Sequence, residues 1–289
     1  MSKQHPVIAI TGSSGAGTTT VKRAFEHIFY RDGIMAAVVE GDSYHRYDRA
    51  ERRLKMADEH LSHSGPQANR FDKLQELLET YGKTGSGEKR SDLHSEEEAA
   101  EHNARLGVDK QPGEFTPWET LEEGTDVLFY EGLHGLVKTD EHDVSAHVDL
   151  GIGVVPNVNL EWIQKIHRDN AERGYSAEAT VDTIMRRMPD YINYITPQFS
   201  VTDINFQRVA TVDTSNPFIA RDIPTPDEIF IVIRFRNPTK HNIDFPYLLS
   251  MLENSFMSRR NTIVVPGGKM GFAMEIILSP IIEQMMDER

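Results

Sequence analysis

The sequence contains no cysteine, and this one absence excludes several kinds of site. Without cysteine the chain forms no disulfide, has no thiolate nucleophile and offers no thiolate to a metal ion. Any metal ion must therefore be bound by oxygen or imidazole ligands. A regulatory switch based on thiol oxidation is excluded for the same reason.

Long apolar runs are also missing. No stretch of about 18 or more apolar residues occurs, so the sequence predicts no membrane-spanning helix. The first six residues lead directly into a short apolar segment and lack the layout of a signal peptide. We therefore expect a soluble, cytoplasmic protein with no membrane partner.

Positive charge is scarce. The chain has 31 Lys and Arg against 45 Asp and Glu, which gives a formal net charge of −14. Nucleic-acid binding depends on cations that neutralise phosphates, so we expect no nucleic-acid partner. A small anionic substrate would need a local basic cluster. With 38% hydrophobic residues over 289 positions, the chain is long and apolar enough to bury a substantial core.

Short apolar segments alternate with segments of helical periodicity. An apolar run without polar alternation is typical of a strand buried on both faces, as in a parallel sheet. The predicted strands are residues 7–11, 35–40, 127–130, 150–155 and 229–235. The predicted helices are residues 21–29, 71–81, 160–171, 177–194 and 269–286. This order predicts an α/β layered fold with a mostly parallel or mixed central sheet flanked by helices.

Residues 83–113 differ in composition from their surroundings. They include the polar run 83–90 and three consecutive glutamates at 96–98, and they contain few apolar residues. We expect this region to be an excursion with a short solvated helix, lying over the surface or the mouth of an active site, and not a separate domain.

A glycine-rich segment follows the first predicted strand. Gly12-Ser13-Ser14-Gly15-Ala16-Gly17-Thr18-Thr19 has the length and end glycines of the phosphate-binding P-loop G-x-x-x-x-G-K-[ST], whose amides cradle phosphates. Thr19 stands where a hydroxyl reaches Mg²⁺, but Thr18 stands where the motif requires lysine. The alternative is a glycine- and serine-rich turn that only begins a helix. A phosphate site here would need its positive charge from elsewhere in the chain.

A candidate source of that charge lies within residues 159–174. The i, i+3 and i+4 spacing of Lys165, Arg168 and Asp169 places them near one another on one face of a predicted helix, with Arg173 farther along it. The alternative is an ordinary solvated face with salt bridges. Gly174 would end this helix.

Together these segments resemble the phosphoribulokinases of the P-loop kinase superfamily, in their bacterial form. The family signature is met by Lys165-Ile166, Arg168-Asp169, Arg173-Gly174, Ser176 and Glu178. The lysine-less loop is the family's own version. The resemblance covers nearly the whole chain and implies a single P-loop kinase domain over residues 1–289, with a divergent surface excursion at about 52–113.

The resemblance implies an activity, namely transfer of the γ-phosphoryl group of MgATP to the 1-hydroxyl of D-ribulose 5-phosphate in the Calvin cycle. It makes Asp42, which follows the second predicted strand, the general base for that hydroxyl. Lys165 and Arg168 would replace the P-loop lysine, and Asp169 would be a second essential carboxylate. Asp169 could equally position Lys165 or Arg168 through an ion pair.

The resemblance also implies the binding residues. Mg²⁺ would be held by Thr19 and by Glu131 after the third predicted strand, usually through water. His45, Arg49 and Arg173 would bind the sugar phosphate, while a role for Arg53 stays open. The residues implied for ATP are Gly12, Ser13, Ser14, Gly15, Ala16, Gly17, Thr18, Thr19 and Thr20.

Regulation in the family divides by type, and a chain without cysteine cannot use the cysteine-pair form. The resemblance to the proteobacterial form implies NADH as activator, AMP as inhibitor and a homo-oligomer. Arg31, Arg234 and Arg259 match basic positions used for the activator at subunit contacts, although Arg260 makes the last assignment uncertain by one residue.

Two other functions stay open. The chain could be another P-loop kinase, acting on a different sugar phosphate or on a nucleoside as uridine kinases do; activity across a panel of acceptors separates these. It could also be a non-catalytic nucleotide-sensing module, although Asp42, Lys165, Arg168 and Asp169 at family positions argue for catalysis.

Overall fold

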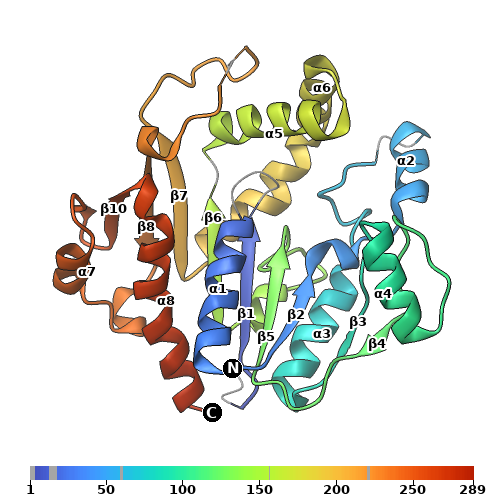
Figure 1. Ribbon diagram of the computed structural model, residues 1–289, viewed down its shortest axis with the longest axis horizontal. Helices are drawn as coiled ribbons and strands as arrows, with labels where there is room; N and C mark the ends of the chain where they lie inside the picture. Colours follow the sequence, from blue (N-terminus) through green and yellow to red (C-terminus); the bar gives the residue numbers. More distant parts are fainter. Residues whose placement is uncertain (1–3, 13–17, 59–60, 156, 220–221) are drawn as a thin grey trace.

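The fold is known from a computed structural model, which describes residues 4–12, 18–58, 61–155, 157–219 and 222–289. An eight-stranded sheet with the strand order β2-β5-β1-β6-β7-β8-β10-β9 forms its centre (Figure 1). Its strands are β1 (Val7–Gly12), β2 (Ala36–Glu40), β5 (Val127–Gly132), β6 (Leu150–Val155), β7 (Ile204–Ala210), β8 (Ile229–Phe235), β9 (Phe256–Arg259) and β10 (Thr262–Pro266). A separate two-stranded sheet joins β3 (Glu88–Lys89) to β4 (Glu119–Thr120).

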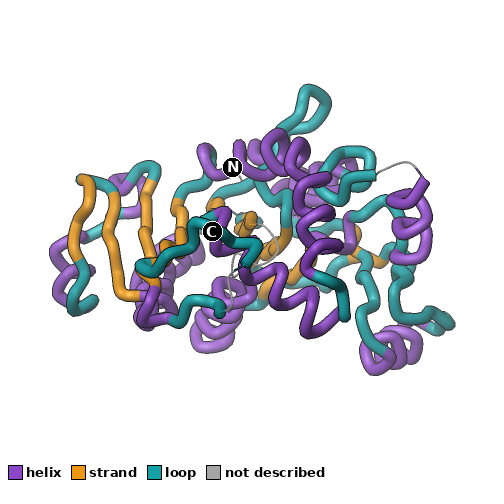
Figure 2. Tube along the Cα trace, turned by 90° about the horizontal axis from the view of Figure 1, so that it is seen from above, coloured by secondary structure: helices purple, strands orange, loops and turns teal. Residues whose placement is uncertain are grey.

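The central sheet is mixed. The strands β2, β5, β1, β6 and β7 pair in parallel, whereas β8, β10 and β9 continue the sheet with antiparallel pairing. Helices lie on both sides of the strands (Figure 2). The helices are α1 (Thr18–Asp32), α2 (Arg49–Asp58), α3 (Phe71–Thr84), α4 (Glu96–Leu106), α5 (Val158–Arg173), α6 (Ala177–Asp190), α7 (Phe245–Met251) and α8 (Met270–Asp287).

Apolar side chains of the strands are buried on both faces of the sheet. One core packs α1 and α8 against one face, with Ile10 and Phe25 among its members. The second core packs α3 against the opposite face, where Leu78 and Tyr81 meet Leu128. Burial on both faces is the physical reason that β1 is apolar at successive positions, as in a parallel sheet covered on two sides.

The expected alternation of strands and helices is confirmed. The five predicted strands correspond to β1, β2, β5, β6 and β8, and the five predicted helices to α1, α3, α5, α6 and α8. The last predicted helix packs its apolar side chains into the core, as expected. Three strands of the central sheet, β7, β9 and β10, were not predicted from the sequence, and neither was the small sheet of β3 and β4.

The region at about 52–113 has two parts with different surroundings. Its α3 helix is part of the core, whereas α4 is a short helix that buries only Ala99 among its described side chains. The α4 helix is capped by Ser95, whose hydroxyl accepts from the amide of Glu98, and it ends at Gly107. The short solvated helix expected within 83–113 is therefore present. That the chain forms one domain stays a prediction.

Among the described helices, none is both long and apolar enough to cross a membrane.

Candidate active site

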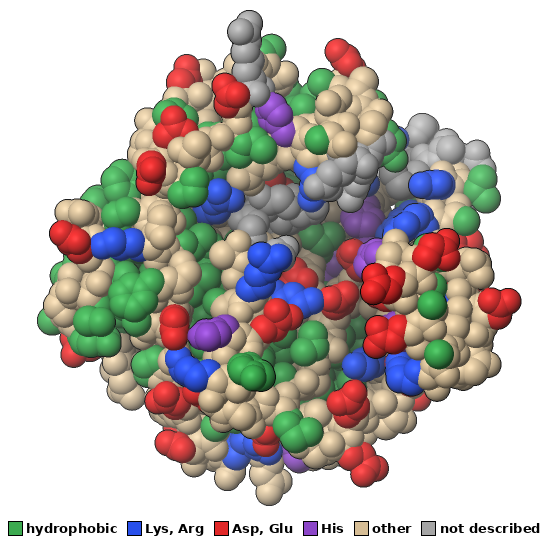
Figure 3. All heavy atoms as spheres, in the orientation of Figure 1, with side chains coloured by type: hydrophobic (Ala, Val, Ile, Leu, Met, Phe, Trp, Pro, Cys, Tyr) green, Lys and Arg blue, Asp and Glu red, His purple; other side chains and the backbone are tan. Residues whose placement is uncertain are grey.

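The carboxyl ends of the parallel strands carry the candidate catalytic residues. Open α/β sheets bind ligands at this edge, where successive loops leave the strands. The β2 and β5 strands end side by side with Glu40 paired in register with Glu131, and β1 ends next to them at Gly12. Figure 3 shows a hollow on one face of the molecule, with acidic, basic and histidine side chains gathered around it.

Two glycines allow the ends of β2 and β5 to approach closely. A Cβ atom on Gly41 would lie 2.8 Å from the Cα of Gly132 and 2.5 Å from the hydroxyl of Tyr130. Contacts this short are excluded, so a side chain at either glycine would push the strand ends apart. Asp42 and Glu131 flank these glycines and are close enough for the negative charge of Asp42 to raise the pKa of Glu131.

Asp42 lies on the short 3₁₀ helix η1 (Gly41–Tyr44), and its side chain is 54% exposed. The Oδ1 atom of Asp42 is 3.4 Å from Nε2 of His45, which is almost completely buried. Desolvation raises the pKa of Asp42, but its contact with His45 and the positive charge of Arg52 outweigh desolvation, so the pKa lies below the ordinary value. At neutral pH Asp42 is therefore an ionised, accessible carboxylate, as a general base requires.

Arg90 fixes the segment that carries Asp42 and His45. Its Nε donates to the carbonyl of Ser43 at 2.8 Å, and its Nη2 donates to the carbonyl of His45 at 2.5 Å. The guanidinium group lies over the ring of Phe115, 3.7 Å from the ring centroid. Burial lowers the pKa of Arg90 to about 10, and the group is still a cation at neutral pH.

Arg49 begins α2 and faces the segment after β3. Its Nη2 lies 3.1 Å from Nδ1 of His94, and its amide donates to the carbonyl of Gly113. Asp92 is buried nearby, and desolvation raises its pKa despite the positive charges of His94, Arg52 and Arg49. Ligand atoms of Asp42, Asp92 and His94 lie within 4.8 Å of one another, which places Arg49 on the same side of the site as Asp42.

Glu131 has partners on α1. Its carboxylate is hydrogen-bonded to Thr18, and Lys22 is close enough to lower its pKa. Desolvation and the charges of Asp42 and Glu40 act in the opposite direction and prevail, so the pKa of Glu131 is raised. Lys22 donates to Glu40 at 2.5 Å. Three carboxylates thus lie near the start of α1 with one lysine between them.

The α5 helix carries the second group of candidate residues. The Lys165 ammonium donates to Asp169 at 2.7 Å, and Nη2 of Arg168 lies 3.3 Å from the other Asp169 oxygen. Asp169 is buried, with its side chain 4% exposed. The helix ends at Gly174, whose φ of +68° is favoured by glycine. The predicted grouping on one face of a helix is confirmed.

Arg187 of α6 acts electrostatically on both groups of residues. Its positive charge acts on Lys165 of α5 and also on His63, whose ring is 4.2 Å from that of His45 between centroids. Arg187 is therefore a cationic neighbour of both the α5 group and the histidines beside Asp42.

Some predicted residues fall outside this description. Five residues of the predicted phosphate loop lie outside the described residues: Ser13, Ser14, Gly15, Ala16 and Gly17. The side chains of Thr19 and Arg173 also lie outside the description. Of the remaining positions predicted for ATP, Gly12 is buried, Thr18 contacts Glu131 and Thr20 is exposed at the start of α1. Arg53 is exposed on α2.

Two of the three predicted regulatory arginines share one row across the sheet. Thr262 of β10 pairs with Arg234 on one side and with Arg259 on the other. Paired residues on adjacent strands project from the same face, so Arg234 and Arg259 lie about 10 Å apart across two strand spacings. Arg31 lies in the last turn of α1 and donates a hydrogen bond to Glu275 of α8. The α8 helix covers the face of the sheet opposite to the one that carries Arg234 and Arg259.

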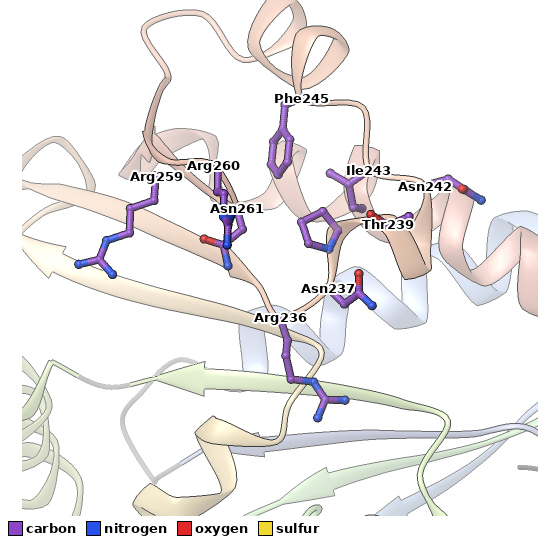
Figure 4. A pocket seen from close by; sticks show the side chains of 10 residues that line it. Arg236, Asn237, Thr239, Asn242, Ile243, Phe245, Arg259, Arg260 and Asn261 are labelled. Carbon is purple, nitrogen blue, oxygen red and sulfur yellow. The ribbon is translucent and has the colours of Figure 1, made fainter.

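A cavity of about 850 Å³ lies beside this row. Arg236, Arg259 and Arg260 line it together with polar side chains and Phe245 (Figure 4). The cavity is lined by the segment that follows β8, by the first residue of α7 and by the end of β9 with the turn after it, so it is separate from the strand ends that carry Asp42.

Several polar residues of the site were not predicted from the sequence. They contact the predicted residues from distant segments, so no local motif marks them. These residues are Lys22, Asn69, Arg90, Asp92, His94 and Arg187.

A parallel sheet with acidic strand ends, a glycine-rich connection from β1 to α1 and a basic helix beside them defines a P-loop phosphotransferase. Residues 7–215 match the Phosphoribulokinase / Uridine kinase family. The chain belongs to this family.

Named relatives match the chain over its full length. It is 61% identical to the phosphoribulokinase of Xanthobacter flavus, with 100% of this chain and 99% of the relative covered. It is 57% identical to that of Nitrobacter vulgaris, with the same coverage. The solved phosphoribulokinase from Rhodobacter spheroides superimposes with a TM-score of 0.88 at 50% identity, covering 99% of each chain.

Proposed function

We propose that this chain is an ATP-dependent phosphoribulokinase, which transfers the γ-phosphoryl group of MgATP to the 1-hydroxyl of D-ribulose 5-phosphate and thereby forms ribulose 1,5-bisphosphate and ADP in the Calvin cycle. The full-length match to relatives of that name supports the proposal. The observation that carries it is the pair formed by Asp42 and His45 at the strand ends, with the Lys165–Asp169 pair across the site.

Asp42 is the proposed general base. Its lowered pKa keeps the carboxylate ionised at neutral pH, and its exposure allows a hydroxyl group to reach it. Removing the hydroxyl proton as the oxygen attacks the γ-phosphorus gives a better nucleophile at the moment of transfer.

Lys165 and Arg168 are the proposed charge stabilisers. Without a lysine in the loop, the charge that develops on the transferring phosphoryl group needs cations from another element. Burial lowers the pKa of Lys165, and Asp169 opposes that effect by hydrogen bonding to the ammonium. Asp169 thus holds Lys165 charged and in place until a phosphate oxygen competes for it.

The residues near α1 fit a magnesium ion. Mg²⁺ prefers oxygen ligands and is commonly bound by one or two carboxylates plus phosphates and waters. Glu131 has a raised pKa because burial and two neighbouring carboxylates leave negative charge uncompensated, which a divalent cation would neutralise. We propose Glu131 and Thr19 as the residues that would hold Mg²⁺, which would neutralise negative charge on the phosphates of ATP.

Arg49 and Arg173 are the proposed direct ligands of the acceptor phosphate. His45, whose two ring nitrogens face Asp42 and Asn69, is proposed to act on the acceptor through Asp42. A guanidinium group offers a fork of donors that matches phosphate oxygens. The 3.1 Å contact between Arg49 and His94 directs that fork toward the Asp42 side of the site.

We also propose the regulation and assembly implied by the resemblance: NADH as activator, AMP as inhibitor and a homo-oligomer that works in the cytoplasm, where ATP is available. The row of Arg234, Thr262 and Arg259 beside the 850 Å³ cavity offers cations suited to phosphates of a nucleotide. Arg31 is on the opposite face, so it could join that site only from another copy of the chain.

A direct assay tests the proposed activity. The purified protein is given MgATP with ribulose 5-phosphate, other pentose phosphates or uridine, and ADP and ribulose 1,5-bisphosphate are measured. We expect kcat/KM to be highest for ribulose 5-phosphate by orders of magnitude. Preference for another acceptor would assign the chain to a different kinase, and nucleotide binding without turnover would assign it to a sensor.

A further inference from the structure

His45 lies between two polar side chains in the floor of the site. Its Nε2 faces Asp42 at 3.4 Å, and its Nδ1 lies 2.8 Å from Oδ1 of Asn69. His45 is 1% exposed and Asn69 is 3% exposed. Because the His45 ring is itself closed to solvent, its two neighbours decide which ring nitrogen carries a proton.

The orientation of the Asn69 amide is fixed by its other contacts. Its Nδ2 donates to the carbonyl of His63 at 2.9 Å and to the carbonyl of Gly65 at 2.8 Å. Both partners are acceptors, so the amino group must point to them and the amide oxygen must point to His45. An amide oxygen only accepts, and Nδ1 of His45 must therefore carry a proton in every protonation state.

This constraint selects one neutral tautomer of His45. When the ring is neutral and Nδ1 carries the proton, Nε2 presents a lone pair to Asp42. Nε2 is also a buried nitrogen without a hydrogen-bond partner among the described residues. Its 3.4 Å distance from Asp42 is longer than an ordinary hydrogen bond, as expected when a lone pair faces a carboxylate.

We propose that Asn69 is a positioning residue for the phosphoryl-transfer reaction: it holds His45 in the Nδ1–H tautomer so that Nε2 can accept the proton collected by Asp42. The inference rests on the proposed function. The acceptor hydroxyl loses its proton to Asp42, which becomes a carboxylic acid. That proton then passes to Nε2, which leaves a carboxylate beside an imidazolium ion. After product release, the proton returns through exposed Asp42 to water.

The charged groups around His45 act on a transferred proton in both directions, since nearby cations disfavour the imidazolium ion and Asp42 favours it. Arg52 acts on His63 and Asp42, and Arg187 acts on His63. Burial lowers the pKa of His63 far below its ordinary value and that of His134 to about 4, so neither ring takes up a proton at neutral pH. Arg90 donates to the His45 carbonyl, and His94 adds positive charge near Asp42. Asp42 is the negative group that faces Nε2 and favours the imidazolium ion.

The tautomer can be measured without any assay of activity. Nitrogen-15 NMR of the histidine rings distinguishes a protonated from an unprotonated ring nitrogen, and comparison with His45→Gln identifies the His45 signals. In the wild-type protein at alkaline pH we expect a protonated Nδ1 and an unprotonated Nε2. The opposite tautomer in the wild-type protein would overturn the proposal whether or not the protein is a phosphoribulokinase.

Kinetics then test the consequence. In Asn69→Ala, Nδ1 loses its acceptor, and Nε2–H can donate to Asp42 and make it a weaker base. We expect the kcat plateau at alkaline pH to fall about 10-fold or more, with KM for ATP nearly unchanged and Nε2 protonated in the spectrum. A normal kcat together with the changed tautomer would overturn the proposal.

His134→Phe is the matched control. His134 anchors the same loop as Asn69, because its Nε2 donates to the carbonyl of Ser64 at 2.9 Å, and its substitution leaves the contact between His45 and Asn69 intact. We expect this variant to keep the Nδ1–H tautomer and to lose far less activity than Asn69→Ala. An equal loss of kcat in both variants would mean that Asn69 only anchors the loop. A correct tautomer in a protein inactive on ribulose 5-phosphate would instead contradict the proposed function.

Discussion

Lys165 and Asp169 form an ion pair one helical turn apart on α5, with 2.7 Å between the ammonium and the carboxylate and with side chains only 11% and 4% exposed. A cation that is already desolvated interacts strongly with a second anion. We propose that this pairing keeps Lys165, which lies on a helix and not in the phosphate loop, ready to contact a phosphate oxygen.

Lys165→Met should lower kcat by about two or more orders of magnitude and change ATP affinity little, because the lost charge acts mainly in the transition state. Steady-state kinetics and ATP titration measure the two quantities. Lys83→Met is a matched control, since Lys83 also pairs with a carboxylate one helical turn away, Glu79, but is exposed on α3. Loss of ATP binding with normal kcat at saturation would make Lys165 a ground-state anchor.

Asp42→Asn should fold and bind ATP normally while kcat falls by about 100-fold or more, because the change keeps the size of the side chain and removes the base. Asp72→Asn is the control, because Asp72 pairs with Arg70 on the surface of α3. A kcat close to that of the wild-type protein would remove Asp42 from the reaction.

Arg49→Ala should raise KM for ribulose 5-phosphate about 10-fold or more and change KM for ATP little, because one charge-assisted phosphate contact is lost. We expect the same pattern for Arg173→Ala. Arg23→Ala, an exposed change on α1, should leave both constants unchanged. Equal increases in both KM values would contradict the assignment of these arginines to the acceptor.

The free energy of unfolding should fall as the pH decreases from about 6.5 to about 4, in part because of His134. Burial lowers the pKa of His134 from 6.5 to about 4, so the unfolded chain takes up a proton in this window and the folded protein does not. The contribution is present above pH 6.5 and is lost as the pH falls, by about 3 kcal/mol at most. Urea unfolding of the wild-type protein and His134→Phe measures it: the variant should show a shallower pH dependence, and equal slopes would refute the assignment.

Kinase activity should rise with NADH and should not respond to dithiothreitol, because the chain has no thiol. Arg234→Ala and Arg259→Ala should each weaken activation and leave the basal rate near that of the wild-type protein, since both arginines are remote from the strand ends that carry Asp42. Arg260→Ala tests the neighbouring position. Unchanged activity with NADH in the wild-type protein would refute the proposed activator.

Local sequence was sufficient for elements whose pattern agrees with their burial. The β1 segment is apolar because both of its faces are covered. In α5, the spacing of Lys165, Arg168 and Asp169 along the sequence was enough to predict that they lie on one face of the helix. The β7 strand was missed because Asn205, Gln207 and Arg208 interrupt its apolar residues. Asn205 is buried there through a hydrogen bond to Thr202 and another to the carbonyl of Phe199, which no pattern within the strand indicates.

The sequence by itself determined the alternating α/β order, the exclusion of thiol chemistry and the residue types at Asp42, Glu131 and the α5 face, because each depends on composition or on spacing within one segment. Only the tertiary structure decided which residues control these groups. Asn69 reaches His45 across 24 positions and Arg90 reaches it across 45, and contacts between segments that far apart leave no periodic signal in the chain. Hydrogen bonds depend on distances of a few tenths of an ångström, and packing of the loops against the strand ends sets those distances.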